Sequence, residues 1–310
     1  MQNYISPYTI SNKMLELVSE ISEKIGKINS HRELESRPHL QRNNRIRSIH
    51  SSLKIEANSL SLSEVRDVIN GHLILGDQKE IQEVKNAYEA YGHITDINPF
   101  SITDLKKVHG IMTYRTVNES GVFRKGDNLM NELFAWMKNS KGVVHPLILA
   151  AVFHYEFVFI HPFSDGNGRM ARLWHTVILY RWRNVFEYIP LESQIEKYQT
   201  EYYDAIAQCQ VNGNSNSFIE FMLEMIRQIL DEVITQIRKS DSETSEYVKR
   251  MLDVMEYDIP YTSNAIMEAL GLRSKETLRK NYINPAIELG VIRMTLPDKP
   301  NSKNQRYVKQ

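Results

Sequence analysis

The strongest constraint on the fold is a helical spacing of apolar residues that continues through most of the first 238 residues of this 310-residue chain. Within residues 10–30, apolar side chains recur at steps of three and four, as one buried face of a helix requires. Further segments with this period, separated by turn signals, are 39–57, 63–70, 79–96, 103–112, 129–138, 146–160, 168–182, 194–209 and 217–238. Strand-like alternation is nearly absent before residue 290, so the sequence predicts an all-α domain.

A second, smaller domain is predicted at the C-terminal end. Residues 239–246 (KSDSETSE) are polar and lack apolar anchors, which is typical of a linker. Three helical patterns with a turn at Gly271 follow, and then two alternating segments, VIRMTL and QRYVK, that predict short strands. Two helices, a turn, a third helix and a hairpin form the layout of a winged helix-turn-helix. We therefore expect a small α+β domain over residues 247–310.

Composition narrows the class of protein. Lys and Arg together number 38, as do Asp and Glu, so no overall charge favours nucleic acid or an anionic membrane. The single cysteine, Cys209, excludes an intrachain disulfide and a cysteine-based zinc cluster. No apolar run is long enough to span a membrane, and the first residues lack the pattern of a secretory signal. We expect a cytoplasmic protein that does not contact membranes.

One short segment concentrates groups that suit an anion. Residues 161–172 read HPFSDGNGRMAR and directly follow the apolar helical stretch AAVFHYEFVFI. Gly166 and Gly168, on either side of Asn167, adopt positive φ angles cheaply. Successive backbone N–H groups can then converge on a phosphate at the start of the next helix. The segment therefore predicts a phosphate-binding loop.

Four side chains of this segment supply the chemistry of a transfer at phosphorus. Arg169 and Arg172 lie three residues apart on one face of the helix, and their guanidinium groups suit a polyphosphate. Asp165 offers a hard oxygen ligand to Mg²⁺, which binds together with substrate phosphates. A neutral imidazole at His161 can take a proton from an incoming hydroxyl. Such transfers mainly need positioning and charge stabilisation, so the pattern indicates a nucleotide-dependent transferase.

The segment resembles, without a mismatch, the signature HPFx[DE]GNGRxxR of the Fic family. The similarity extends to the upstream elements VHGIM and GVFR and covers roughly residues 40–210. It implies a Fic-type helical bundle, with N-terminal helices over residues 1–98 and a catalytic core over residues 99–238. It also implies an adenylyltransferase that moves AMP from ATP onto a Ser, Thr or Tyr hydroxyl of a target protein, with release of pyrophosphate. The target itself is not encoded in the pattern.

Carried over by position, the resemblance implies a role for each residue of the signature. His161 would be the base that activates the hydroxyl of the target, and Asp165 would hold Mg²⁺. Phe163 would be a core anchor that orients the loop. The groups implied to bind the phosphates of ATP are those of Gly166, Asn167, Gly168, Arg169 and Arg172.

An upstream segment resembles the inhibitory motif [ST]xxxE[GN] of many Fic proteins. In SIHSSLKIEANSLS, Ser52 and Glu56 lie four residues apart on a predicted helix around residues 48–58. The resemblance implies that Glu56 pairs with Arg172 and competes with the γ-phosphate of ATP for this guanidinium. The alternative is that Glu56 is a surface residue paired with Lys54 or solvent.

Two departures from the family pattern affect these expectations. Ala57 stands where the inhibitory motif has Gly or Asn, and because alanine favours helix, we expect the helix to persist through it. Only KGDN separates Arg124 from the next helical pattern, LMNELFAWM, where family members commonly carry a hairpin that docks the target. This hairpin is predicted to be shortened or rebuilt, which leaves the mode of target docking open.

The C-terminal domain supports a different class of function. From Gly271 to Gln310 nine Lys and Arg stand against three Asp and Glu. This surplus of positive charge is compatible with contacts either to DNA or to a protein. The candidates for contact with DNA phosphates are Arg273, Lys275, Arg279 and Lys280, and the alternative is that they form a solvated basic face. The alternative function is thus a nucleotide-responsive DNA-binding regulator or a toxin–antitoxin-type protein.

Three smaller expectations remain. Other phosphorus chemistry on the same scaffold, including removal of AMP, is compatible with the motif. The apolar faces of the long N-terminal helices allow a homodimer. The remaining histidines lack metal-ligand spacing and are expected to be structural, among them His109, His145, His154 and His175.

Overall fold

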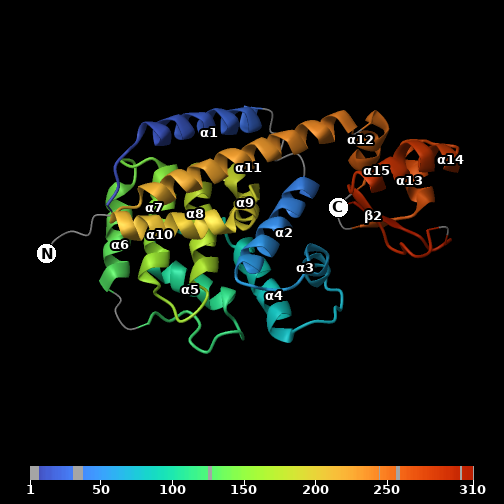
Figure 1. Cartoon of the computed structure of the whole chain (residues 1–310). Helices are drawn as coiled ribbons and strands as arrows, with labels where there is room; N and C mark the ends of the chain where they lie inside the picture. The colour runs from blue at the N-terminus through green and yellow to red at the C-terminus, as the bar shows by residue number, and fades with distance from the viewer. Residues whose placement is uncertain are drawn as a thin grey trace. The chain divides into compact units, whose positions relative to one another are not determined.

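The computed structural model describes residues 7–30, 38–124, 128–243, 245–255, 259–300 and 302–309. The predicted dominance of helices up to residue 238 is confirmed (Figure 1). The helices of this part are α1 (Asn12–Ser30), α2 (Pro38–Ile55), α3 (Leu62–Ile69), α4 (Gln78–Gly92), α5 (Ile102–Met112), α6 (Asn128–Ser140), α7 (Pro146–Ile160), α8 (Asn167–Trp182), the 3₁₀ helix η1 (Asn184–Tyr188), α9 (Leu191–Lys197), α10 (Gln199–Asn212) and α11 (Asn216–Glu243).

The adjacent helices α7 and α8 form the centre of this helical part. α7 is apolar on all sides, and a helix of that kind must be buried all round. His145 and Pro146 begin it, as N-cap and first helical residue, and residues 147–157 are all buried. α8 buries Trp174, whose indole Nε1 donates to the carbonyl of Pro99 at 3.1 Å. The short loop between α7 and α8 is therefore anchored in the core at both ends.

The apolar face of α1 is covered within the chain. Polar contacts join α1 and its N-cap region to α11; among them, the Lys24 ammonium lies 2.5 Å from Asp231, and the Ser11 hydroxyl donates to Glu220 at 2.6 Å. The buried face comprises Met14, Leu17, Ile21, Ile25 and Ile28, each at most 6% exposed. The sequence analysis considered this apolar face as a surface for a homodimer. In the structure, the face is buried within the chain itself.

Several helix boundaries differ from the predictions; the segment predicted over 79–96, for example, is an α-helix only as far as Gly92. The pattern over residues 194–209 is divided between α9 and α10, because Tyr198 leaves the helical region with ψ 42°. The predicted linker at 239–246 is helical as far as Glu243, since α11 continues through it. Polar composition does not separate a loop from a solvated helix end, because Lys and Glu are good helix formers. Among the described residues, none of the helices is both long enough and apolar enough to cross a membrane.

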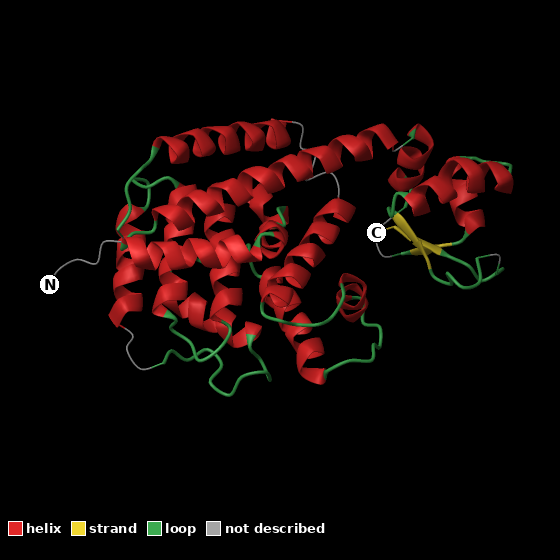
Figure 2. Ribbon diagram, in the orientation of Figure 1, coloured by secondary structure: helices red, strands yellow, loops and turns green. Residues whose placement is uncertain are grey.

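The chain divides into two compact units at Asp231–Glu232 within α11, and residues 38–42 belong to the second unit. The elements of the second unit after α11 are α12 (Glu246–Asp253), β1 (Pro260–Tyr261), α13 (Ser263–Leu270), α14 (Lys275–Leu278), the π-helical η2 (Arg279–Ile283), α15 (Asn284–Glu288), β2 (Ile292–Met294) and β3 (Tyr307–Lys309). The three strands form an antiparallel sheet in the order β1-β3-β2 (Figure 2). This confirms a small α+β domain, with β1 as an additional edge strand that tolerates Pro260.

Buried Glu156 on α7 predicts a pH dependence of stability. Burial raises the pKa of this carboxyl from 4.5 to about 7, so above pH 4.5 the unfolded chain releases a proton that the folded chain still holds. The free energy of unfolding therefore falls as pH rises through this window, by roughly 3 kcal/mol at about 1.4 kcal/mol per pH unit. Urea unfolding at about pH 5 and about pH 8 measures this fall, which Glu156→Gln should reduce. Exposed Glu89 on α4 provides the matched control, and Glu89→Gln should leave the fall unchanged.

Candidate active site

The segment HPFSDGNGRMAR forms the turn between α7 and α8 and the first turns of α8. His161 ends α7 in the left-handed conformation, with φ 52°, and it is exposed. Gly166 precedes α8 with φ 78°, which glycine adopts without strain, and it has no side chain to cap the helix. The first N–H groups of α8 thus receive no acceptor from the N-cap side chain, and the helix dipole favours an anion at this end.

Two buried side chains hold the loop in shape. The Asn167 amide accepts from the backbone N–H of Phe163 and donates to the carbonyl of Phe163, both at 2.9 Å. His109 of α5 stacks on the Phe163 ring, with the ring centroids 3.6 Å apart and 5° between the planes. The side chain of Asn167 is therefore a clamp on the loop, and its backbone N–H is the group available for an anion.

His109 also positions the loop through both ring nitrogens. Nδ1 accepts from the N–H of Gly121 at 2.8 Å, so Nε2 carries the proton and donates to the carbonyl of Asp165 at 2.9 Å. Burial lowers the pKa of His109, which favours this neutral form. The sequence predicted a structural role for His109 from its lack of metal-ligand spacing, but it did not indicate the partner of this residue, which lies 56 residues away.

Arg124 supports the backbone of His161. Arg124 donates its backbone N–H to the carbonyl of Pro162 at 2.7 Å and its Nη2 to the carbonyl of His161 at 2.5 Å. The backbone of His161 is thus held while its imidazole stays exposed. The predicted shortening of the docking hairpin concerns residues 125–127, which lie outside the described residues, together with Asn128, where α6 begins.

Arg172 is buried and bonded to α2. Its side chain is 1% exposed. Nε donates to the Ser52 hydroxyl at 3.2 Å, and Nη2 donates to the Ser52 carbonyl and to Glu56 Oε1, both at 2.8 Å. Burial opposes the charged guanidinium, but the Glu56 carboxylate and two buried tyrosines outweigh it, so the pKa of Arg172 is raised. Lys54, the alternative partner of Glu56, pairs instead with Glu196 at 2.7 Å.

The Glu56 carboxylate also lies against the first turn of α8. A Cβ atom added to Gly168 would stand 2.2 Å from Glu56 Oε1 and 3.1 Å from Arg172 Nη1. No side chain fits at position 168 unless these groups move. An internal carboxylate thus lies at the helix N-terminus where the sequence predicts a phosphate.

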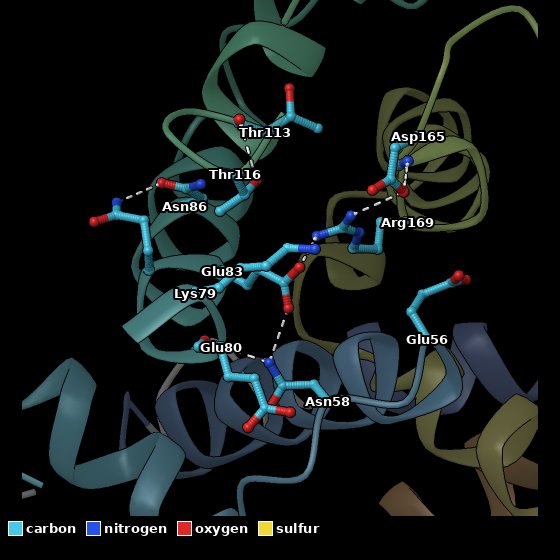
Figure 3. A network of polar contacts seen from close by, with 12 residues as sticks. Glu56, Asn58, Lys79, Glu80, Glu83, Asn86, Thr113, Thr116, Asp165 and Arg169 are labelled. Atoms are coloured by element: carbon cyan, nitrogen blue, oxygen red, sulfur yellow. Dashed lines mark hydrogen bonds and ion pairs between the residues drawn. The ribbon is translucent and has the colours of Figure 1, made fainter. Parts of the chain in front are cut away.

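A second network surrounds Arg169 (Figure 3). Its side chain is 4% exposed, with Nη1 3.3 Å from Glu83 Oε1 and Nη2 3.5 Å from Asp165 Oδ1. Asn58 donates from its amide to Glu83 Oε2 at 3.0 Å, which links this network to the segment after α2. Within the described residues, Nε and Nη1 of Arg169 make no hydrogen bond. These buried donors suit an anionic ligand, and the sequence alone did not identify Glu83 as their neighbour.

Asp165 fits the coordination habits of Mg²⁺. Its side chain is 50% exposed, and Oδ1 accepts from the N–H of Gly166 at 2.5 Å. The described part of the chain contains no group of three or more potential metal-ligating side chains. Mg²⁺ is commonly held by one or two carboxylates, with waters and substrate phosphates completing its shell. A single half-exposed carboxylate beside the uncapped N-terminus of α8 fits that donor set.

The end of α2 corrects one expectation. α2 ends at Ile55, and Ala57 adopts φ 65°, so the helix does not persist through Ala57. Ala57 donates its N–H to the Lys54 carbonyl at 3.0 Å, and Asn58 donates to the Leu53 carbonyl at 3.2 Å. These are the two hydrogen bonds of a Schellman motif, which places a left-handed residue at the position of Ala57. Glycine and asparagine adopt that conformation more readily than alanine, which accounts for their place in the inhibitory motif.

Ala57→Gly is therefore expected to stabilise the protein. Removal of a left-handed alanine gains about 1–2 kcal/mol, and the greater freedom of glycine in the unfolded chain offsets about 0.4–1 kcal/mol of it. Urea unfolding should show a net gain of roughly 0.5–1 kcal/mol. Ala57→Val should have the opposite sign, because a β-branched residue is disfavoured at positive φ. A less stable glycine variant would contradict this account.

Carboxylates of α9 anchor α2. The Ser48 and Tyr91 hydroxyls donate to the two oxygens of Glu192, each at 2.7 Å, and the Ser51 hydroxyl donates to Glu196 at 2.6 Å. Glu192 is 1% exposed, and burial raises its pKa. These contacts hold α2 against the bundle. The sequence did not indicate them, because Ser48 and Glu192 are 144 residues apart.

The other predicted residues lie elsewhere. His145 caps α7 by accepting from the N–H of Leu147 at 3.3 Å. His154 is buried with Nε2 3.0 Å from the Tyr202 hydroxyl, and burial lowers the pKa of His175 to about 3. The basic residues proposed for DNA contact are all exposed and belong to the second unit: Arg273, Lys275, Arg279 and Lys280.

Comparison with protein families gives two matches. The Fic/DOC family matches residues 99–179. The C-terminal domain of Fic-like proteins, described as "Filamentation induced by cAMP protein Fic-like", matches residues 246–308.

Individual proteins extend these matches. The protein adenylyltransferase Fic of Aedes aegypti is 29% identical over 211 residues, which cover 60% of this chain and 41% of that protein. The chain therefore spans less than half of this curated relative. A crystal structure of a Fic family protein from Desulfovibrio desulfuricans G20 has a TM-score of 0.75 and 38% identity, over 99% of this chain and 98% of that one. Fic-1 from C. elegans shares the fold, with a TM-score of 0.65 and 21% identity over 73% of each chain.

Proposed function

This chain belongs to the Fic family, and on that premise we propose that it transfers AMP from ATP to a hydroxyl group of a target protein. One observation carries the proposal: HPFSDGNGRMAR folds so that an exposed histidine stands beside a helix N-terminus with two buried guanidinium groups. The relatives named protein adenylyltransferase Fic support the same chemistry.

His161 is the proposed general base. The hydroxyl oxygen of the target forms a bond to the α-phosphorus, and the bond from this phosphorus to the oxygen shared with the β-phosphate breaks. Pyrophosphate leaves with that electron pair, and the hydroxyl proton passes to the imidazole of His161. The exposure of the ring supports this role, because a large substrate must reach it.

The phosphates of ATP are proposed to lie at the N-terminus of α8. The backbone N–H groups of Gly166, Asn167 and Gly168 would form the anion hole, which the absence of a capping side chain supports. Arg169 would contribute its buried Nε, which lacks a hydrogen bond within the described residues, and Nη1, which also lacks one but lies 3.3 Å from Glu83 Oε1. Arg172 would hold the γ-phosphate and so orient the α-phosphorus for in-line attack.

Asp165 is the proposed ligand of Mg²⁺. When bound, this ion supplies positive charge to the phosphate oxygens. The carbonyl of Asp165 accepts from His109, and its carboxylate accepts from Gly166, so the chain orients this side chain before a substrate arrives.

Glu56 is the proposed brake on the reaction. It lies on the same guanidinium and against the same helix turn that the phosphates would use. ATP could then bind only in a pose unsuited to attack, and positional errors of about 1 Å cost about a hundredfold in rate. Ser52 would hold Arg172 in place for this contact.

Further points remain proposals. The domain boundaries are proposed at residues 98, 238 and 246, and the protein is proposed to act in the cytoplasm. The proposed acceptor of AMP is defined only by its chemistry, as a hydroxyl group of a Ser, Thr or Tyr side chain in a protein.

Transfer from differently labelled ATP tests the proposed function. The Glu56→Gly protein is incubated with lysate and ATP that carries a radiolabel on either the α- or the γ-phosphate. Protein bands should gain label from the α-phosphate alone, with one pyrophosphate released per AMP. Labelling from the γ-phosphate would indicate a kinase-like transfer of phosphate instead of AMP transfer. Loss of AMP from protein that already carries it would indicate that the enzyme removes AMP.

A further inference from the structure

The second unit, taken by itself, contains a groove of about 680 Å³ that the proposed function does not use. Its walls are the N-terminus of α13, the helix formed by α14, η2 and α15, and the hairpin segment between residues 294 and 307.

Cations dominate the charge of the lining. Lys275 and Arg279 approach from the helix, and Lys303 from the hairpin, and all three are exposed. None of the three forms an ion pair with a carboxylate in the described part of the chain. Glu288 is the single acidic residue of the lining. The groove therefore favours an anionic occupant.

Polar groups of the lining match phosphate in particular. Thr262 caps α13 by accepting from the N–H of Ala265 at 3.1 Å, and Ser263 and Asn264 follow at the start of this helix. Proteins hold the phosphates of DNA with Arg and Lys, with Ser, Thr and Asn side chains, and with helix N-termini. All of these kinds of donor line the groove.

A π-helical turn lies at the same place. Asn284 donates its N–H to the carbonyl of Arg279, five residues earlier. The following Pro285 has no N–H, and its ring clashes with a carbonyl four residues earlier, which favours a widened turn. Single π turns within helices are frequent at functional sites. This turn begins at Arg279, one of the cations of the groove.

We propose that this groove binds the phosphate backbone of duplex DNA. Charge complementarity and the phosphate-directed donors support a nucleic acid. Single strands are usually held by stacking on exposed aromatic rings, whereas Tyr307, the aromatic residue of the lining, is 8% exposed. The duplex backbone is therefore the occupant that the lining fits, independently of AMP transfer by the first unit.

Matched pairs of charge-removing variants test the groove in the full-length protein. Lys275→Gln/Arg279→Gln removes two lining cations, and Arg273→Gln/Lys280→Gln removes two neighbouring cations that do not line it. Fluorescence anisotropy with a labelled DNA duplex is measured across salt concentrations. The lining pair should weaken binding at least tenfold and reduce the salt slope by about one per lost phosphate contact. The neighbouring pair should have little effect.

Other outcomes would overturn the proposal. Equal losses of DNA affinity in both pairs of variants would indicate binding by a diffuse basic surface instead of the groove. If the unaltered protein shows no measurable binding of the duplex, the proposal is wrong. Displacement of the duplex by polyglutamate at lower concentration than by unlabelled DNA would reassign the groove to an acidic peptide. Automodification with labelled ATP should be the same in all variants, so failure of DNA binding is distinguishable from failure of the proposed transferase.

Discussion

His161→Ala is expected to lower the rate of AMP transfer by about 10²–10⁴-fold. The proposed reaction needs a group that accepts the proton of the attacking hydroxyl, and the exposed imidazole of His161 lies at the end of α7, five residues before Gly166, the N-cap of α8. The change is best made in the Glu56→Gly protein, so that the brake does not hide the loss. Incorporation of labelled AMP into lysate proteins measures it.

Binding of ATP provides the control for this variant. The groups of α8 that we propose to bind the phosphates do not include the altered side chain, so calorimetry with ATP and Mg²⁺ should give a dissociation constant within a few-fold of that of the parent protein. Loss of transfer with intact binding identifies a role in the chemical step. Unchanged transfer would place the base on another residue.

Glu56→Gly is expected to raise AMP transfer by about a hundredfold. Removal of this carboxylate frees the Arg172 guanidinium and empties the space against Gly168, which the γ-phosphate and the anion hole require. The measurements are automodification and consumption of ATP. Glu56→Gln is the graded comparison, because it keeps the size of the side chain and removes its charge, and it should fall between the two.

The same substitution should make stability depend on ATP. Without Glu56, Arg172 keeps its contacts with Ser52 but loses the carboxylate that compensates its burial, and a buried charge without its partner is destabilising. The melting temperature of Glu56→Gly should therefore be lower without ligand and should rise more on addition of ATP than that of the unaltered protein. If the activity and the melting temperature of Glu56→Gly equal those of the parent protein, Glu56 does not inhibit the reaction.

Local features of the structure were predictable from the sequence. A period of three to four residues identifies a helix face wherever it lies, so α1, α7 and α8 were predicted within two residues of their observed ends. The loop from His161 to Gly166 was predictable for the same reason, because its glycines and the following helix are contiguous. The signature within it led to the family.

Boundaries decided by weak local preferences were less predictable. No Gly or Pro marks the break between α9 and α10 at Tyr198 in the sequence. The polar residues 239–243 are compatible with a helix as well as with a linker. At Ala57 the helix propensity of alanine predicted a continuing helix. The structure instead has Ala57 in the left-handed conformation, and the next residue, Asn58, donates a hydrogen bond to Glu83.

The sequence by itself determined the helices, the small C-terminal domain and the loop between α7 and α8, because each depends on neighbours within a few positions. Only the tertiary structure decided the partners of those residues: His109 for Asp165, Glu83 for Arg169, and Glu192 for the helix α2, which ends immediately before Glu56. These contacts join residues 56 to 144 positions apart. They follow from how buried helices pack against one another, and no local spacing in the chain records that packing.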